Sequence, residues 1–216
     1  MQRVHQICQA IKSKVGNPVT LPNGGILTIR RFQQLGLFLG INGGFEQLHY
    51  LLLDAFSHPI SKEIAERELY DHQQTYPYFS YKFLCAFQNI LPFETNPLYA
   101  VLHESIYCQG KPSLWSAKRV LEENSQFRAT FEYSEMRPFY FTGEMIFDWM
   151  FDDYSQLAPF KEAAEILAKK SDWPQLYDME KLSELKVPLA CVVYHDDMYV
   201  DFNLSVSMAR PIPSSR

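Results

Sequence analysis

One short run near the C-terminus constrains the possible fold more than any other part of the sequence. Residues 187–194 read VPLACVVY, a run that is almost continuously apolar and β-prone. Such a run is typical of a strand that is covered on both faces, as in a parallel sheet. Buried backbone amides need hydrogen-bonding partners, and the chain offers this strand no neighbour. We therefore predict that it pairs with strands outside the 216 residues.

The rest of the sequence is patterned as helices. Apolar residues at helical spacing over residues 4–15 predict a first helix that ends at Gly16, and Thr28 is a candidate N-cap for a helix to about residue 39. Between them, the turn residues at 22–25 predict a small hairpin. Further helices are predicted over residues 45–55, 61–70, 80–90, 96–108, 113–124, 138–151 and 159–169.

These patterns predict a mainly α chain in two parts. Residues 1–185 form a helical domain, and residues 186–216 carry the single strand and a following helix. At 216 residues, the chain is long enough for one domain with a substantial core and part of a second.

Charge and hydropathy exclude several classes of partner. The formal net charge is −5 and no basic stripe is present, so we do not expect nucleic acid as a partner. The longest apolar runs fall far short of the roughly 20 residues that a membrane-spanning helix needs. The first residues also lack the apolar stretch of a signal peptide, so we expect a cytoplasmic protein without a membrane partner.

The four cysteines are widely spaced and form no Cys-x-x-Cys pair. This spacing argues against disulfides and against a zinc site, and it favours reduced, buried thiols. We therefore expect no metal and no cofactor. Aromatic residues make up 15% of the chain, which suits a well-packed core or an apolar pocket.

An acidic cluster follows the predicted strand directly. His195, Asp196 and Asp197 lie at its carboxyl end, which is where α/β folds place their active sites. In α/β-hydrolases, the chain order of the catalytic triad is serine, then an acid on a late strand, then histidine. Two other interpretations remain open. The acids are turn residues that cap the next helix, or they form a metal site with Asp201.

The other members of a serine triad are missing from the sequence. It contains no Gly-x-Ser-x-Gly motif, and the nearest lookalike, at residues 40–44, has Asn42 at the position of the nucleophile. All six histidines precede Asp197. The chain as given therefore cannot complete such a triad.

Two glutamates lie in apolar surroundings. Glu144 is within the aromatic-rich run 139–151, and Glu104 is within 102–108. A buried carboxylate needs a cationic or hydrogen-bonding partner, or it stays protonated. That partner is either internal, with Arg119, Lys118 or His103 as candidates, or a ligand. Two carboxylates that converge in an aromatic cavity would suit an ammonium group attached to an apolar ring.

Four segments of the chain resemble the prolyl aminopeptidases, also called proline iminopeptidases, which are serine peptidases of the α/β-hydrolase family. The segments are NPLYAVLHESIYCQG (96–110), SLWSAKRV (113–120), FTGEMIFDWMF (141–151) and VPLACVVYHDDMYVD (187–201). The resemblance implies that residues 1–185 are a helical cap and that residues 186–216 are a fragment of the α/β-hydrolase core.

The resemblance also implies roles for individual residues. Asp197 matches the triad acid, and Glu104 and Glu144 resemble the cap glutamates that hold the terminal amine of the substrate. Phe147 and Trp149 are candidates for shaping the proline pocket. The implied substrate is a peptide with a free N-terminal proline.

In this family the nucleophilic serine lies upstream of the region that corresponds to Met1, and the triad histidine lies downstream of Arg216. We therefore expect the 216 residues to be a truncated part of the enzyme, inactive without the missing core segment or another chain. The competing hypothesis is a non-catalytic helical module that binds an amine ligand or a partner protein.

Overall fold

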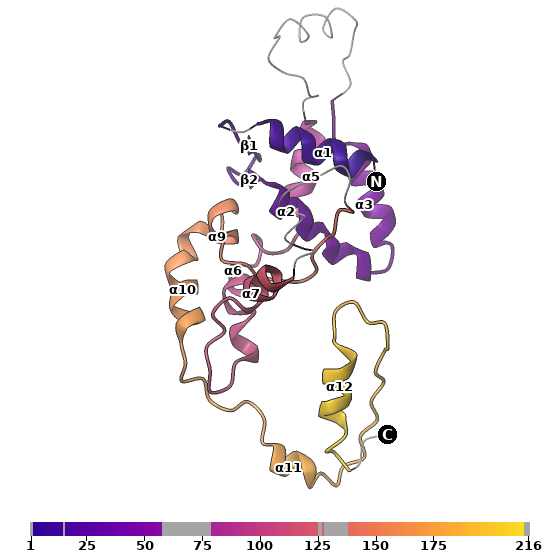
Figure 1. Ribbon diagram of the computed structural model, residues 1–216, viewed down its shortest axis with the longest axis vertical. Helices are drawn as coiled ribbons and strands as arrows, with labels where there is room; N and C mark the ends of the chain where they lie inside the picture. The colour runs from indigo at the N-terminus through magenta and orange to yellow at the C-terminus, as the bar shows by residue number, and fades with distance from the viewer. Residues whose placement is uncertain (1, 15, 58–78, 125–126, 128–137, 214–216) are drawn as a thin grey trace, which may run out of the picture.

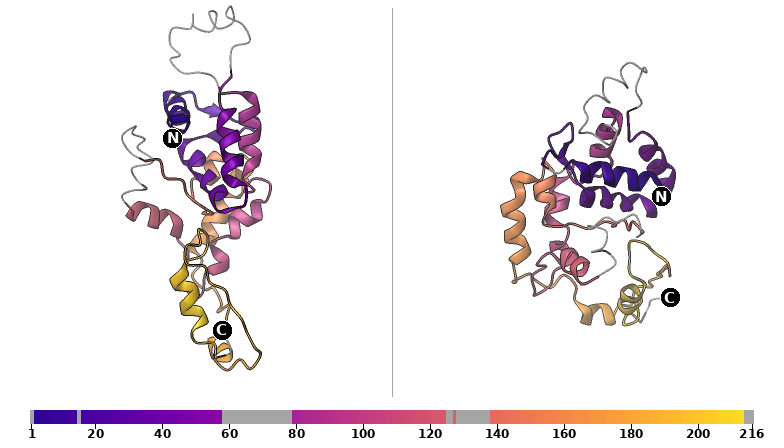
Figure 2. Two further views of the ribbon diagram at one scale, coloured as in Figure 1. Left: turned by 90° about the vertical axis from the view of Figure 1, so that its right-hand side faces the viewer. Right: turned by 45° about the horizontal axis from the view of Figure 1, so that its top comes forward.

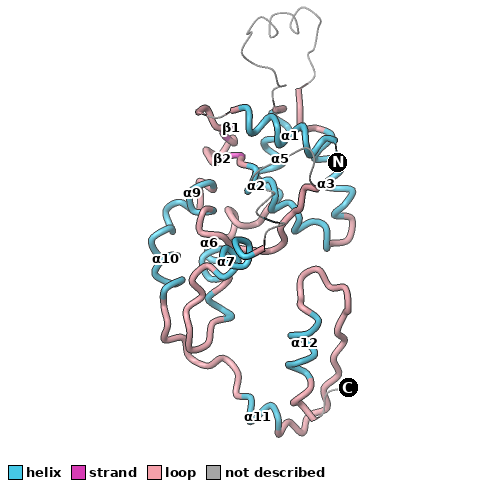
Figure 3. Tube along the Cα trace, viewed as in Figure 1, coloured by secondary structure: helices cyan, strands magenta, loops and turns pink. Residues whose placement is uncertain are grey.

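The computed structural model describes residues 2–14, 16–57, 79–124, 127 and 138–213. Among these residues the chain is mainly α, which confirms the predicted fold class (Figures 1 and 3). Helices α1, α3 and α5 lie at one end of an elongated molecule, and helices α11 and α12 lie at the other (Figures 1 and 2).

The N-terminal part follows the predicted order of elements. Thr28 caps α2 by accepting a hydrogen bond from the amide of Arg31 at 3.1 Å, and Ser80 caps α5 in the same way. The elements are α1 (Gln2–Ser13), β1 (Val19–Thr20), β2 (Ile26–Leu27), α2 (Ile29–Gln33), the 3₁₀ helix η1 (Gln34–Gly40), α3 (Gly44–Leu53) and α5 (Tyr81–Ile90). Strands β1 and β2 pair antiparallel, as the predicted hairpin requires.

The segment from residue 91 to residue 169 is built from short helices around an apolar cluster that is distinct from the one packed between α1, α2, α3 and α5. The fully buried side chains of Phe93, Met150 and Tyr154 lie in this cluster. Its elements are α6 (Pro97–Leu102), η2 (Ser105–Tyr107), α7 (Ser116–Glu123), α9 (Met150–Asp153), η3 (Ala158–Phe160) and α10 (Lys161–Lys169). Helices α11 (Met179–Ser183) and α12 (Phe202–Ala209) follow. The predicted helix over 61–70 lies outside the described residues.

A buried ion pair joins helix α2 to the segment that follows α5. Arg31 on α2 donates to Glu94 at 2.6 Å, and both side chains are at most 4% exposed. Arg31 also donates to the backbone carbonyl of Asp153 at 2.9 Å, and its guanidinium lies 3.7 Å from the ring centre of Tyr154. Since a planar guanidinium presents several donors at fixed angles, this one residue fixes α2 against two distant segments.

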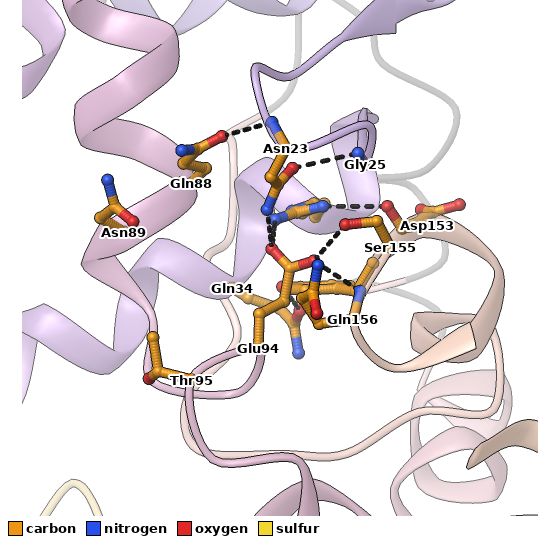
Figure 4. Close-up of polar contacts among 12 residues, drawn as sticks. Asn23, Gly25, Gln34, Gln88, Asn89, Glu94, Thr95, Asp153, Ser155 and Gln156 are labelled. Atoms are coloured by element: carbon orange, nitrogen blue, oxygen red, sulfur yellow. Dashed lines mark hydrogen bonds and ion pairs between the residues drawn. The ribbon is translucent and has the colours of Figure 1, made fainter. Parts of the chain in front are cut away.

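The remaining capacity of Glu94 is also used. Its carboxylate accepts hydrogen bonds from the side chain of Asn23 at 2.9 Å and from the hydroxyl of Ser155 and the amide of Gln156, both at 3.2 Å (Figure 4). A buried charge is tolerated when it is paired and hydrogen-bonded in this way.

The predicted helix over residues 138–151 is wrong for most of its length. Only α9, at its end, is helical, and residues 138–147 are irregular. The reason is that the backbone of this segment bonds to another helix. The carbonyl of Tyr140 accepts from the side chain of Gln33, the amide of Thr142 donates to the carbonyl of Gln33, and the carbonyl of Met145 accepts from Gln34.

The predicted buried strand over 187–194 is also not observed. The segment is irregular apart from a single β-bridge residue, Leu189, and Val192 and Tyr194 are 79% and 68% exposed. Within the described residues the two-stranded sheet is formed by β1 and β2, which leaves this run without a sheet to join. The helix expected after it is present as α12.

The cysteines are free thiols. Cys8 and Cys108 are buried, as predicted, whereas Cys85 is half-buried and Cys191 is exposed. The exposed position of Cys191 follows from the missing strand. Within the described ranges, none of the helices combines the length and apolar character that crossing a membrane would require.

The buried ion pair yields a stability prediction. Replacing Arg31 by Met strands the Glu94 carboxylate in the interior, so the free energy of unfolding should fall by about 3–5 kcal/mol. The same substitution at Lys82 breaks an exposed pair with Asp54 and should cost less than about 1 kcal/mol. Urea unfolding followed by circular dichroism measures both, and equal losses would contradict the assigned importance of Arg31.

Candidate functional site

A cavity of about 410 Å³ lies where four segments of the chain and the side chain of Phe127 meet. Its walls come from η1, from the end of α6 and from η2, from the irregular segment 141–145, and from the turn before α12. The residues that line it include Gly40, His103, Thr142, Glu144 and Tyr199. Three of the four motifs that carried the family resemblance therefore contribute to one cavity.

Glu144 lies in the wall of this cavity and is exposed. The sequence predicted a carboxylate buried within a helix, and both parts of that prediction are wrong. Gly143, beside it, has open space around its Cα, and the segment is held at Thr142 and Met145 by bonds to α2 and η1. The carboxylate is therefore presented from a bend that is fixed on both sides.

Glu104 is half-buried and caps α7. Its two carboxylate oxygens accept hydrogen bonds from the amides of Ser116 at 3.0 Å and Ala117 at 2.9 Å. A carboxylate at this position satisfies free amides and interacts favourably with the positive end of the helix dipole.

The cationic partners predicted for Glu104 bind elsewhere. Lys118 pairs with Asp148 at 2.5 Å, and Arg119 donates to the carbonyls of Ser113 and Leu114. Glu104 is thus held by backbone amides, not by the predicted ion pairs.

His103 links the two glutamates. It precedes Glu104 in the chain and lines the cavity together with Glu144. Burial lowers the pKa of its imidazole below the ordinary 6.5, although the charge of Glu104 and the nearby backbone of Glu144 act in the opposite direction. The ring packs against Tyr99 and Tyr107, with centroids 5.1 and 6.0 Å away.

Two buried polar atoms in the cavity wall have no partner among the described residues. These are the Nδ1 of His103 and the Oγ1 of Thr142. Buried polar groups are normally hydrogen-bonded, so such atoms call for an explanation in terms of water or a ligand.

Asp197 occupies an exposed turn. Its Oδ1 accepts hydrogen bonds from the amides of Tyr199 at 2.8 Å and Val200 at 3.1 Å. This geometry agrees with the turn interpretation of the acidic cluster, although the cap of α12 is Asp201, which accepts from Leu204 at 2.7 Å. The described residues contain no group of three or more acidic, histidine or cysteine side chains arranged to hold a metal ion.

Phe147 and Trp149 are core residues. Their rings stack with centroids 5.4 Å apart and an interplanar angle of 14°, and both side chains are buried. The guanidinium of Arg30 lies 4.8 Å from the ring of Trp149. Neither residue is in the lining of the cavity that contains Glu144.

Three residues of the site were missed or undervalued from the sequence. His103 was considered as an ion-pair partner, and not as a residue of the substrate site, although its place beside Glu104 in the matched motif was a usable signal. Tyr199 also lies in a matched motif, two residues after Asp197. The buried hydroxyl of Thr142 had no sequence signal, because the helix predicted there was wrong.

The capping role of Glu104 predicts a specific loss of stability. Glu104→Ala should lower the free energy of unfolding by about 1 kcal/mol, since two amides at the start of α7 lose their acceptor. Glu122→Ala, an exposed position near the other end of α7, is the matched control and should change it by less than about 0.5 kcal/mol. Chemical denaturation at pH 7 compares them, and a Glu104 effect no larger than that of Glu122 would refute the cap.

The lowered pKa of His103 predicts a pH dependence of stability. The unfolded chain binds a proton near pH 6.5 that the folded chain binds only at lower pH, so stability falls as pH drops below about 6.5. His103→Gln should show a smaller loss between pH 7 and pH 5 than the wild type. His49→Gln, at an exposed position, is the control, and an equal pH dependence in all three proteins would contradict the burial of His103.

Comparison with known proteins finds two relatives that align with nearly the whole chain. A proline iminopeptidase of Aeromonas sobria is 45% identical over 198 residues, which are 92% of this chain and 41% of that protein. Proline iminopeptidase aneH of Aspergillus aculeatus is 31% identical over 210 residues, which are 97% of this chain and 42% of that protein. No family model matches the sequence. The resemblance to prolyl aminopeptidases is therefore confirmed, and the chain spans about two-fifths of the length of these relatives.

Proposed function

We propose that this chain is part of a prolyl aminopeptidase, a serine exopeptidase that releases N-terminal proline from peptides. The observation that carries the proposal is the 45% identity to a protein named proline iminopeptidase over 92% of the chain. The cavity at the meeting point of three matched motifs supports it, because a substrate site is expected where such motifs converge.

In this proposal Asp197 is the acid of the catalytic triad. Such an acid orients the triad histidine and stabilises the imidazolium that forms when the serine attacks the carbonyl of the substrate. The 216 residues contain no Gly-x-Ser-x-Gly motif and no histidine after Asp197. We therefore assign the serine and the histidine to sequence outside these residues, and we expect the chain alone to be inactive.

Glu144 is proposed to bind the ammonium group of the N-terminal proline. Its exposed carboxylate in the cavity wall is available to a ligand, and charge complementarity of this kind positions the substrate. Glu104 is proposed as the second acidic group. Although its oxygens already accept two amides, a carboxylate has about four acceptor sites, and its negative charge acts on His103, which lines the cavity.

The apolar walls of the cavity suit a pyrrolidine ring. Leu39, Tyr107 and Phe141 contribute carbon surface to it. We propose that Phe147 and Trp149 shape the pocket indirectly, as the packed support of the segment that carries Glu144. A peptide whose terminal amine is blocked would lack the cation that pairs with Glu144. The enzyme would therefore cleave only at a free N-terminus, as an exopeptidase does.

The hydrolysis of a proline arylamide tests the proposal. The complete gene product should release the arylamine, and the 216-residue chain alone should not. Release by neither protein, with the arylamide still bound in equilibrium dialysis, would sink the peptidase proposal and favour the non-catalytic binding module. Release by the 216-residue chain would show that the assigned origin of the serine and the histidine is wrong.

The role of Glu144 is tested by Glu144→Gln in the complete gene product. Loss of a charged hydrogen bond to the proline ammonium should raise KM by roughly 10- to 100-fold. Glu46→Gln, at an exposed position on α3 outside the cavity, is the matched control and should leave KM unchanged. An unchanged KM in Glu144→Gln would remove Glu144 from the site.

A further inference from the structure

Tyr199 connects the turn that holds Asp197 to the helical part of the chain. Its amide donates to the carboxylate of Asp197 at 2.8 Å, and its hydroxyl donates to the backbone carbonyl of Leu37, in η1, at 2.6 Å. Residues 37 and 199 are 162 positions apart in the sequence. In Figure 1, the loop that precedes α12 extends toward the helical part of the molecule.

The tyrosine ring rests on a glycine. A Cβ atom added at Gly40 would lie 2.5 Å from two carbons of the Tyr199 ring, so any larger residue there displaces the ring. The hydrogen bond and the ring contact together define a seat on η1 that a hydroxyl-bearing aromatic side chain fits. Tyr199 as a whole remains 42% exposed, so packing into a core does not explain the position of its side chain.

The surrounding segment is largely exposed in the part that the structure describes. Helix α12 buries none of its residues, and the apolar side chains of Val192, Met198 and Leu204 are all more than 60% exposed. A carboxylate in an exposed turn has many accessible orientations, and restricting it to one of them costs conformational entropy. A bond from the turn to a fixed helix lowers that cost.

We infer that Tyr199 is a positioning residue, which fixes the turn of Asp197 on η1 so that the acid and the cavity of Glu144 keep one relative placement. The inference rests on the proposed function for the role of Asp197. Tyr199 itself lines the cavity, and η1 is the element whose neighbour α2 holds the Glu144 segment. Asp197 and Glu144, two of the three proposed functional carboxylates, are thus held in place by the same helical unit, α2 with η1.

Hydrogen exchange on the 216-residue chain tests the contact without any activity. Tyr199→Phe removes the hydroxyl and keeps the ring, and exchange of the amides at residues 199 and 200 should accelerate about fivefold, the effect of one neutral hydrogen bond. Tyr194→Phe is the matched control, because Tyr194 is 68% exposed in the same segment, and it should leave these rates unchanged. Equal rates in the two variants would overturn the inference.

A second pair of variants tests the seat from the other side. Gly40→Ala should displace the ring and accelerate the same amides at least as much as Tyr199→Phe. Gly143→Ala is the control for exchange, because a Cβ there meets no atom within 4 Å. If Gly40→Ala does not accelerate the exchange of these amides, the proposed contact between the Tyr199 ring and η1 is wrong.

Kinetics of the complete gene product then test the consequence for the reaction. Tyr199→Phe should lower kcat about fivefold and leave KM for the proline arylamide within about twofold, because the variant disturbs the acid and not the amine contact. Tyr199→Ala should lower kcat further, so the ring retained in the Phe variant gives partial rescue. A parallel change in KM, or no change in kcat, would overturn the positioning role.

Failure of the two proposals can be told apart. If the wild-type gene product does not hydrolyse the arylamide, the peptidase proposal fails while the exchange rates still decide whether Tyr199 holds the turn. If the wild type is active and Tyr199→Phe matches Tyr194→Phe in both exchange and kcat, only the inference about Tyr199 fails.

Discussion

The ion pair between Arg31 and Glu94 is the interaction on which the arrangement of the described residues depends. It is buried on both sides, and its two carboxylate oxygens and its guanidinium draw in the hairpin, the segment after α5 and the segment after α9 (Figure 4). Such a pair contributes little net stability when compared with a well-packed apolar core. Its effect is geometric, since a buried charge is tolerated only where it is paired and hydrogen-bonded, and the groups that do this come from separate segments of the chain.

The residues that follow Arg31 in the chain hold one wall of the cavity in place. Two residues after Arg31, the backbone and side chain of Gln33 hold the irregular segment at Thr142 and Tyr140. Gln34 holds the same segment at Met145 and accepts a hydrogen bond from the hydroxyl of Tyr154 at 2.5 Å. The Glu144 carboxylate is therefore positioned through consecutive residues of one short helical stretch.

The local elements could be predicted from the sequence, and the long-range pairings could not. Thr28 and Ser80 cap helices as expected, because capping depends on residues three positions apart. The helix predicted through Glu144 failed because Gln33 and Gln34, more than 100 residues away, supply the partners for its backbone. Aromatic content alone does not distinguish a buried helix from an irregular segment that packs equally well.

The candidate site shows the same division. The motifs identified Glu104, Glu144 and Asp197, and two of these side chains adjoin or line one cavity. Their burial and partners were not predictable. Glu104 accepts from amides because α7 begins beside it, and the strand expected before Asp197 is not formed, since a β-prone run becomes a strand only beside another strand.

The distance in sequence between Arg31 and the groups that it binds has a consequence for the synthesis of the chain. Arg31 and the Asp153 carbonyl that it binds are 122 residues apart. At ribosomal rates, this distance corresponds to a delay on the order of ten seconds. During that interval α1, α2, the hairpin and α3 can pack around their own apolar cluster, while a guanidinium destined for the interior remains in water. The buried contacts of Arg31 can therefore form only after Glu94, and then Asp153, have been synthesised.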